Sequence, residues 1–302
     1  MARIIGSPSR YIQGKGTLAE ITKYTERLGK KLLILVSKSG KKRVEEKINK
    51  AVEGTDTTVV WEIFNGECSK SEVNRIGENL KKEKCDVVVG IGGGKILDTA
   101  KAVAYYEDIA VVCVPTAAST DAPCSALSVL YTDDGQFDEY LWLPANPDII
   151  LLDTDIIVAA PVRLIVSGMG DALATYFETR ACMRSNTTSC MGGSVSKTAM
   201  ALSELCFKTL MEDGAKALLA VNAGACTPAV ENIIEANTYL SGIGFESGGI
   251  AAAHAIHNGL TCIEETHGMY HGEKVAFGVL SQLVLENVST EDLEEVVEFC
   301  IN

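Results

Sequence analysis

The N-terminal half of the chain alternates short apolar runs with amphipathic segments, and this alternation limits its fold more than any other feature. Leu32–Val36 is apolar at every position, as a strand that is covered on both faces must be. Strands that recur about every 25 residues with helices between them are typical of a parallel sheet built from βαβ units. Strands are predicted at 4–5, 32–36, 57–63, 86–91 and 110–114, and helices at 17–28, 40–52, 69–84 and 95–106. We therefore predict an α/β domain with a Rossmann-like parallel sheet.

Two of these predicted helices carry a signature of a helix N-terminus. Thr17 with Glu20, and Ser69 with Glu72, have the spacing of a capping box. In that motif a hydroxyl and a carboxylate satisfy free backbone N–H groups. The two pairs predict where the helices begin.

The pattern changes after Pro115. Segments 127–131 and 137–143 predict a β-hairpin around Asp133-Asp134-Gly135, and 149–152 predicts a further strand. Pro161 is predicted at the first position of a helix, and the rest of the sequence predicts almost only helices. These are 162–184, 192–211, 230–239 and 273–287, with further buried helices at 215–225 and 242–255. We therefore predict an α/β domain at 1–160 and an all-α domain at 161–302, with a ligand in the cleft between them.

Composition excludes several classes of partner. The 302 residues carry a net charge of −13, which argues against binding nucleic acid or anionic membrane surfaces. The sequence has no apolar run of the ~18 residues that a membrane span needs, and its start lacks a signal-peptide pattern. The ten cysteines form no CxxC pair, as is usual for reduced core residues. We expect a cytoplasmic protein that acts on a small molecule.

All four histidines of the chain lie in one short segment, at positions 254, 257, 267 and 271. The spacings of three and four predict that each pair shares one helical face. A single buried histidine is more often a hydrogen-bonded core residue than a ligand. Four histidines in one segment favour a metal site, in which two bind the metal and two are neighbours.

Asp171 offers a third ligand, because it ends the sequence SGMGD before a predicted helical stretch. Its structural alternative is an acid in a first helical turn that the helix dipole stabilises. One carboxylate and two histidines would leave a coordination position open, as a catalytic zinc ion requires. Glu178 and Glu246 are further candidates, and spacing alone does not choose among the three.

The sequence GIGGGK at 90–95 stands between an apolar strand and a helix. Its glycines allow close approach of a ligand and positive φ angles, and the helix N-terminus favours an anion such as pyrophosphate. It differs from GxGxxG at Lys95, and from the P-loop pattern at Val89 and Ile96. Asp98, one turn into the helix, is either an ordinary first-turn acid or a polar contact to the ligand.

The segment PTAASTDAPCS at 115–125 follows the next predicted strand. Loops at the carboxyl ends of parallel strands line the ligand crevice, so its hydroxyls can bond a dinucleotide. Asp121 is the one charged residue in the segment. Its structural alternative is an Asx-turn.

Five segments of the chain together resemble the glycerol dehydrogenases. They are GIGGGKILDTAKAV, PTAASTDAPCSALSVLY, SGMGDALATYFE, HAIHNGLT and THGMYHGEKVAFG. That family belongs to the iron-containing (group III) alcohol dehydrogenase superfamily, whose architecture is dehydroquinate synthase-like. The resemblance covers the whole chain, and the segment beginning at Pro115 is its most specific part. It implies a homo-oligomeric enzyme that uses zinc and NAD to oxidise glycerol and related vicinal diols to ketones such as dihydroxyacetone.

The resemblance also assigns roles to residues. It implies that Asp171, His254 and His271 hold zinc and that Asp121 contacts glycerol, so these four are the expected catalytic residues. His257 and His267 would then be neighbours of the metal site. The expected NAD contacts are Ser37, Gly92, Gly93, Gly94, Lys95, Asp98, Thr116, Ser119, Ser125, Leu127 and Tyr131.

Three alternatives stay open at this point. Family members continue for several more helices, whereas this sequence stops inside a helical pattern, so we expect a helical domain shortened at its C-terminus. A shortened chain could bind a nucleotide without catalysis. A related dehydrogenase could act on another polyol or on a phosphorylated one, although 248–278 offers only Lys274 as a basic partner besides histidine. A generic α/β nucleotide-binding module without a metal is disfavoured by the histidine cluster.

The resemblance also predicts how the chain chooses between NAD and NADP. The family usually has an acidic residue after the second strand, where it bonds the adenosine ribose, but here Ser37 and Lys38 follow that strand. Without the carboxylate, exclusion of a 2′-phosphate weakens, so we expect this chain to use NADP more readily than its relatives do. The ratio of kcat/KM for NAD and NADP, measured beside a relative with the acidic residue, tests this expectation. Equal ratios in the two enzymes would contradict it.

Overall fold

The structure is a computed structural model that describes residues 1–301, and these divide into two compact units. The α/β unit comprises Pro8–Ala117 and Ala122–Ile157. The helical unit comprises Met1–Ser7, Ala118–Asp121 and Val158 onwards. Two short segments from the N-terminal half of the sequence therefore group with the helices.

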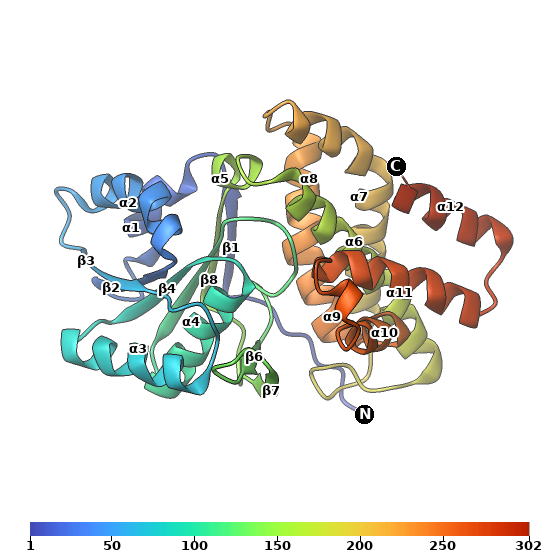
Figure 1. The fold of residues 1–302 in the computed structure, drawn as a ribbon, viewed down its shortest axis with the longest axis horizontal. Coiled ribbons are helices and arrows are strands. Elements are labelled where there is room, and N and C mark those ends of the chain that lie inside the picture. Colours follow the sequence, from blue (N-terminus) through green and yellow to red (C-terminus); the bar gives the residue numbers. More distant parts are fainter. Residues whose placement is uncertain (302) are drawn as a thin grey trace. The chain divides into compact units, whose positions relative to one another are not determined.

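The α/β unit contains a six-stranded sheet in which every neighbouring pair is parallel, in the order β1-β8-β5-β4-β2-β3. Its strands are β1 (Arg10–Gly14), β2 (Lys31–Val36), β3 (Thr58–Ile63), β4 (Val87–Gly92), β5 (Ala110–Pro115) and β8 (Ile149–Asp153). Its helices are the 3₁₀ turn η1 (Thr17–Glu20), α1 (Ile21–Thr25), α2 (Lys38–Val52), α3 (Lys70–Glu83), α4 (Gly94–Glu107) and α5 (Thr154–Val158). Helices α1 and α2 cover one face of the sheet, and α3 and α4 cover the other (Figure 1). The predicted parallel α/β fold is confirmed.

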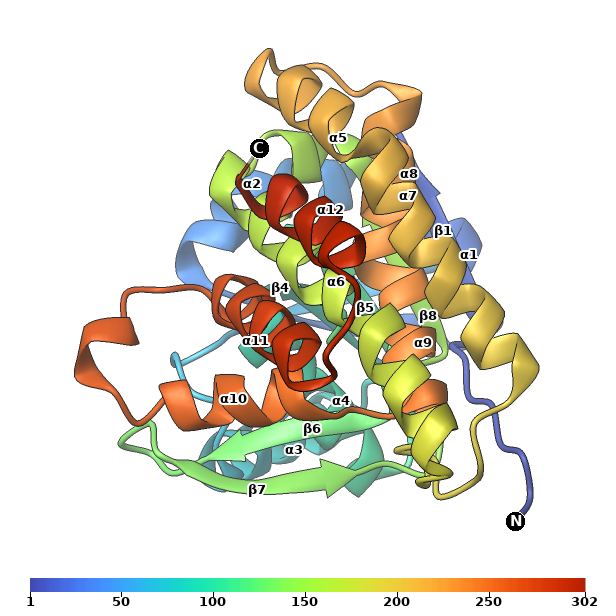
Figure 2. The same cartoon turned by 90° about the vertical axis from the view of Figure 1, so that its right-hand side faces the viewer.

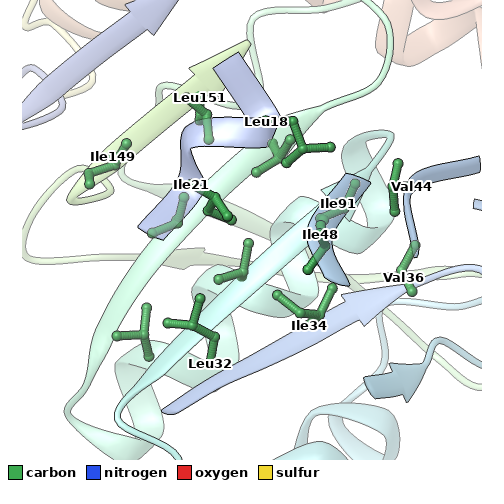
Figure 3. Packing of buried hydrophobic residues seen from close by; sticks show 14 residues of the cluster. Leu18, Ile21, Leu32, Ile34, Val36, Val44, Ile48, Ile91, Ile149 and Leu151 are labelled. Atoms are coloured by element: carbon green, nitrogen blue, oxygen red, sulfur yellow. The ribbon is translucent and has the colours of Figure 1, made fainter. Parts of the chain in front are cut away.

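The core of this unit follows from the two-residue period of its strands. On one face, Ile34 of β2 and Ile91 of β4 pack against Ile48 of α2 (Figure 3). The intervening residues Leu33 and Leu35 are fully buried as well, since alternate side chains of a strand point to opposite faces. Strands apolar at every position are therefore what a sheet covered on both sides needs.

The first predicted strand, 4–5, is wrong. Ile4 and Ile5 are exposed and lie outside any strand, and the sheet instead begins with β1, which pairs with β8. A strand needs a partner, and the partner of β1 comes more than 130 residues later in the chain. Two isolated apolar residues do not reveal that pairing.

The two predicted capping boxes differ in outcome. At Thr17 the prediction is wrong, because its hydroxyl donates to the carbonyl of Leu152 at 2.8 Å and a 3₁₀ turn begins there. Ser69 does cap α3, accepting from the backbone N–H of Glu72 at 3.3 Å. The carboxylate of Glu72 accepts from the N–H of Asn65 instead of completing the box.

The predicted β-hairpin is confirmed. It consists of β6 (Leu127–Tyr131) and β7 (Phe137–Trp142), which pair antiparallel in a separate two-stranded sheet. Its first strand buries Ser128 and Leu130, and these anchor the hairpin in the α/β unit.

The helical unit is built around α6 (Val162–Ser185), which packs against α7, α9 and α11. Figure 2 faces this unit and shows α11 with α10 and α12 beside it. The other elements are α7 (Lys197–Asn222), α8 (Pro228–Glu235), the π turn η2 (Ala236–Leu240), α9 (Ser241–Gly248), α10 (Ala252–Leu260), the 3₁₀ turn η3 (Glu264–Thr266), α11 (His271–Leu285) and α12 (Thr290–Ile301). No helix within residues 1–301 is long and apolar enough to cross a membrane.

The all-helical prediction is confirmed, but several helices begin or end at residues other than those predicted. Pro161 precedes the first helical residue of α6 as its N-cap instead of occupying the first position. Helix α7 begins only at Lys197, because Ser196 caps it by accepting from the N–H of Ala199 at 3.0 Å. It then continues through most of 215–225, for which a separate buried helix is predicted. The predicted buried helix at 242–255 is divided between α9 and α10 by Gly249, which has a φ of 95°.

A buried lysine holds part of the α/β unit together, and its removal is a test of this fold. Lys101 of α4 is 1% exposed, pairs with Asp98 at 2.9 Å and donates to the carbonyl oxygens of Ala122 and Leu127. In Lys101→Met a buried carboxylate and these carbonyls lose their cationic partner, so we expect unfolding to become easier by about 3–5 kcal/mol. Urea denaturation measures the change. Lys50→Met is the matched control, because its partner Glu46 is exposed and no measurable change is expected. A Lys101 variant as stable as this control would contradict the prediction.

Candidate metal centre and cofactor-binding segment

Three side chains from three helices converge in the helical unit. Asp171 lies on α6, His254 on α10 and His271 at the start of α11. One ligand atom from each lies within 4.8 Å of the others. Oδ1 of Asp171 is 3.0 Å from Nε2 of His271 and 3.6 Å from Nε2 of His254. The structure thus brings together the three residues expected to bind the metal.

Two glycines explain how these helices come so close. At Gly272, next to His271, an added Cβ would lie 1.7 Å from the carbonyl oxygen of Ser167 on α6. At Gly278, an added Cβ would lie 2.4 Å from the carbonyl oxygen of Ala253, next to His254. Only glycine permits these backbone contacts. Each of the two contacts therefore places a histidine ligand.

Glu178 fixes the orientation of His254. Its carboxylate lies 2.6 Å from Nδ1 of His254 and accepts from the backbone N–H groups of Ala251 and His254 at 2.8 and 2.9 Å. With Nδ1 donating to this carboxylate, Nε2 is left to face Asp171, as is usual for a metal-binding histidine. Glu178 is thus a hydrogen-bond partner of His254, an expected metal ligand, and is not itself a ligand. Glu178 lies seven residues after Asp171, two turns along the same face of α6, and this spacing was the signal that could have predicted its role.

The donor atoms fit a divalent cation. Among residues 1–301, Oδ1 of Asp171 is buried and accepts no hydrogen bond, whereas Oδ2 accepts from the backbone N–H of Asp121 at 3.3 Å. An unsatisfied buried carboxylate oxygen is costly unless a cation compensates it. One carboxylate oxygen and two imidazole nitrogens form a donor set that zinc accepts.

The charges of these three side chains and of Glu178 agree with this fit. Burial alone would lower the pKa of His254, but Glu178 and Asp171 raise that pKa well above its usual value. Burial opposes ionisation of Asp171, yet His271 and His254 hold the pKa of its carboxyl well below the usual range. This cluster therefore stabilises a positive charge between these side chains, which a metal ion can supply in place of a proton.

Asp121 lies beside the three ligands. The residue is 9% exposed, and its Oδ2 accepts from the hydroxyl of Ser241 at 2.7 Å. Burial and the neighbouring carboxylate of Asp171 raise the pKa of Asp121 well above its usual value. The hydrogen bond from Ser241 thus holds the side chain of Asp121 across 120 positions of the chain, which a local Asx-turn alone would not do.

The other two histidines are not part of the group of three expected metal ligands. His257 shares α10 with His254, as predicted, and packs against the ring of His271 with centroids 4.2 Å apart. Burial and His271 lower the pKa of His257 to about 4, so its ring is neutral. The predicted common helical face of His267 and His271 is wrong, because His267 precedes α11 and its Nε2 lies 3.1 Å from the carbonyl oxygen of Thr261.

The glycine-rich segment lies at the topological switch point of the α/β unit. Strand β2 pairs with β3 on one side and β4 on the other, and ligands bind at the carboxyl ends of strands at such a point. Ser37 follows β2 and Gly93 follows β4. An added Cβ at Gly93 or Gly94 would meet nothing within 4 Å, so the backbone there is open to a ligand. Within the described part of the chain, no side chain caps this N-terminus of α4.

The expected positive φ angles in this segment are wrong. Gly93 has a φ of −89°, and Gly92 and Gly94 are absent from the residues with positive φ. An added Cβ at Gly92 would lie 2.5 Å from the side chain of Ile96. These glycines therefore provide room for close packing and for a ligand, and the backbone itself is ordinary.

Most of the remaining residues expected to contact NAD have contacts within the protein. Lys95 forms an ion pair with Glu67 at 2.6 Å and lies over the ring of Tyr131. The carboxylate of Asp98 pairs with Lys101 and accepts from the N–H of Val129 at 3.2 Å, so it anchors the hairpin. The backbone N–H of Thr116 donates to the carbonyl oxygen of Gly92, the hydroxyl of Ser125 donates to the carbonyl oxygen of Ala122, and the side chain of Ser37 caps α2. Leu127 is the first residue of β6, and Ser119 belongs to the helical unit. Their contacts with a cofactor stay predictions.

Known proteins resemble the chain closely. Residues 8–154 match the family described as iron-containing alcohol dehydrogenase. A glycerol dehydrogenase of Pseudomonas putida is 52% identical over 300 residues, which are 99% of this chain and 82% of that protein. A glycolaldehyde reductase of Halobacterium salinarum is 44% identical over an alignment of 303 residues that covers 100% of this chain and 82% of that protein. The crystal structure of glycerol dehydrogenase from Schizosaccharomyces pombe superposes with a TM-score of 0.95 at 41% identity, over 99% of this chain and 76% of that one.

The chain belongs to the iron-containing alcohol dehydrogenase family, because close relatives match it along almost its whole length. It is an oxidoreductase, and it is similar to glycerol dehydrogenases of this family along almost its whole length. The use of NAD and a divalent metal, which the sequence predicts, agrees with this family and with the cluster of Asp171, His254 and His271.

The role of Glu178 can be tested through metal affinity. In Glu178→Gln the carboxylate that orients His254 is lost while the side-chain volume is kept, so we expect zinc affinity to fall about 10–100-fold. Competition with a fluorescent chelator measures the dissociation constant. Glu286→Gln is the matched control, because it removes a carboxylate in the same unit that pairs with Arg180. Equal zinc affinities of both variants and the unchanged chain would contradict the prediction.

Proposed function

We propose that the chain is a zinc-dependent dehydrogenase that oxidises glycerol and related vicinal diols, converting glycerol to dihydroxyacetone with transfer of hydride to NAD. The observation that supports it most directly is the buried Oδ1 of Asp171, which lacks a hydrogen-bond donor and faces two histidine nitrogens. The high identity to glycerol dehydrogenases supports the choice of substrate.

In this proposal Asp171, His254 and His271 hold the metal. Zinc bound there would supply a Lewis acid that lowers the pKa of a substrate hydroxyl, and NAD would supply the acceptor for the hydride of the carbon that bears this hydroxyl. The chain supplies the positions of the groups. Glu178 keeps Nε2 of His254 directed at the site, and the carboxylate of Asp121 accepts a hydrogen bond from a substrate hydroxyl. The hydroxyl proton passes to solvent.

The same proposal assigns the cofactor to the α/β unit. The pyrophosphate of NAD would lie at the N-terminus of α4, where Gly93 and Gly94 leave open space and the helix dipole favours an anion. A NAD-binding domain at 1–160, a metal-binding domain at 161–302, a homo-oligomeric state and a cytoplasmic location are part of this proposal.

A second substrate is supported by one specific observation. The Halobacterium salinarum relative is a glycolaldehyde reductase, and it matches this chain over its full length. Glycolaldehyde carries adjacent oxygens, as glycerol does, so the same metal and Asp121 could bind both. Reduction of glycolaldehyde with NADH, compared with reduction of dihydroxyacetone, decides between them. The substrate with the higher kcat/KM is the preferred one.

The first test of the proposed function is metal removal. NAD-dependent oxidation of glycerol is measured before treatment with a chelator, after it, and after zinc is added back. We expect activity to disappear on chelation and to return with zinc, because the Lewis acid is required for the hydroxyl to ionise near neutral pH. Circular dichroism after chelation verifies that the chain stays folded. A folded chain without turnover at any stage would support the non-catalytic alternative.

A further inference from the structure

One helix of the helical unit is connected to the segment that carries Asp121 at two points. Nδ2 of Asn237 donates to the carbonyl oxygen of Ala118 at 3.0 Å. The hydroxyl of Ser241 donates to Oδ2 of Asp121 at 2.7 Å. Both donors are fully buried, and both belong to the continuous helix formed by α8, η2 and α9. The helix thus holds both ends of Ala118–Asp121.

The π turn η2 lies where these two donors occur. Asn237 lies within the turn, and Ser241 follows it directly. Nδ2 of Asn237 also donates to the carbonyl oxygen of Ile165 at 3.0 Å, so the turn is bonded to α6 as well. Single π turns are frequent at functional sites.

The hydroxyl of Ser241 is itself held by a second hydroxyl. Oγ1 of Thr175 lies 2.9 Å from Oγ of Ser241. A serine has one O–H to donate, and Ser241 donates it to Asp121, so Thr175 must be the donor to Ser241. Both residues are at most 1% exposed, so bulk solvent does not compete for these hydroxyls. The order of donation is therefore Thr175 to Ser241 to Asp121.

This chain of hydrogen bonds begins on the helix that carries a metal ligand. Thr175 lies one turn after Asp171 on α6. The backbone N–H of Asp121 also donates to Oδ2 of Asp171 at 3.3 Å. Two connections thus set the position of the Asp121 carboxylate relative to the Asp171 carboxylate, one through its backbone and one through its side chain.

We propose that Ser241, with Thr175 behind it and Asn237 beside it, positions the Asp121 carboxylate to accept a substrate hydroxyl. The three are positioning residues, since none of them is assigned a contact with substrate, metal or cofactor. The inference rests on the proposed function in that Asp121 is taken to bind the substrate.

The test compares two variants that each remove one hydroxyl. In Ser241→Ala, Asp121 loses its donor, and we expect KM for glycerol to rise about tenfold, the size of one hydrogen bond to a charged group. KM for NAD and the zinc dissociation constant should change less than about twofold, because the cofactor segment and the metal ligands keep their own contacts. In Thr175→Val, which preserves the shape of the side chain, we expect a smaller rise in KM for glycerol, about threefold. Thr175→Val carries the test if Ser241→Ala does not fold.

Ser203→Ala is the matched control. Ser203 is also a fully buried serine of the helical unit, and its hydroxyl donates to a threonine hydroxyl, that of Thr179, at 3.0 Å. Its removal should cost stability without changing KM for glycerol. A rise in KM of equal size in Ser203→Ala, or no rise in Ser241→Ala, would overturn the inference.

A double-mutant cycle separates this inference from the proposed function. If the unchanged chain does not oxidise glycerol or another diol, the proposed function fails. The unfolding midpoints of Ser241→Ala, Asp121→Ala and the double variant then decide whether Ser241 acts through Asp121. Non-additive midpoints show that the hydroxyl acts through Asp121 and support the positioning role. Additive midpoints show that it does not, and overturn it.

Discussion

The close approach of α6 and α11 is the constraint on which the helical unit depends. The backbone of Gly272 lies against the carbonyl of Ser167 with no room for a side chain, and this contact places His271 beside Asp171. A second contact at Gly278 places α10, and with it His254. The metal site is therefore a result of helix packing, because its ligands come from three helices and no single helix could present them together.

Two buried carboxylates, one in each unit, differ in how their charge is compensated. In the α/β unit, Asp98 is compensated by Lys101 from its own helix. In the helical unit, Asp171 keeps one oxygen without a hydrogen-bond donor among the described residues, and the surrounding groups favour a positive charge there. The contrast separates a structural carboxylate, complete within the protein, from a functional one that needs an ion.

Much of the architecture was readable before the structure. Apolar strands such as Leu32–Val36 and the hairpin around Asp133 are encoded by local periodicity and turn residues, so their existence and type are confirmed. Errors arose where distant contacts decide local structure. Thr17 matches a helix cap but bonds to Leu152, and Ile4–Ile5 matches a strand but has no partner strand. His267 has helical spacing to His271, yet a turn separates them.

The sequence by itself determined which residue types were available for chemistry: a histidine cluster, an isolated aspartate in each of two segments, and a glycine-rich turn. Only the tertiary structure decided their partners. Glu178 behind His254 and Ser241 behind Asp121 are joined by hydrogen bonds across 76 and 120 positions of the chain. The reason is physical: periodicity and capping act between residues a few positions apart, whereas the partner of a buried polar group depends on which helices pack together.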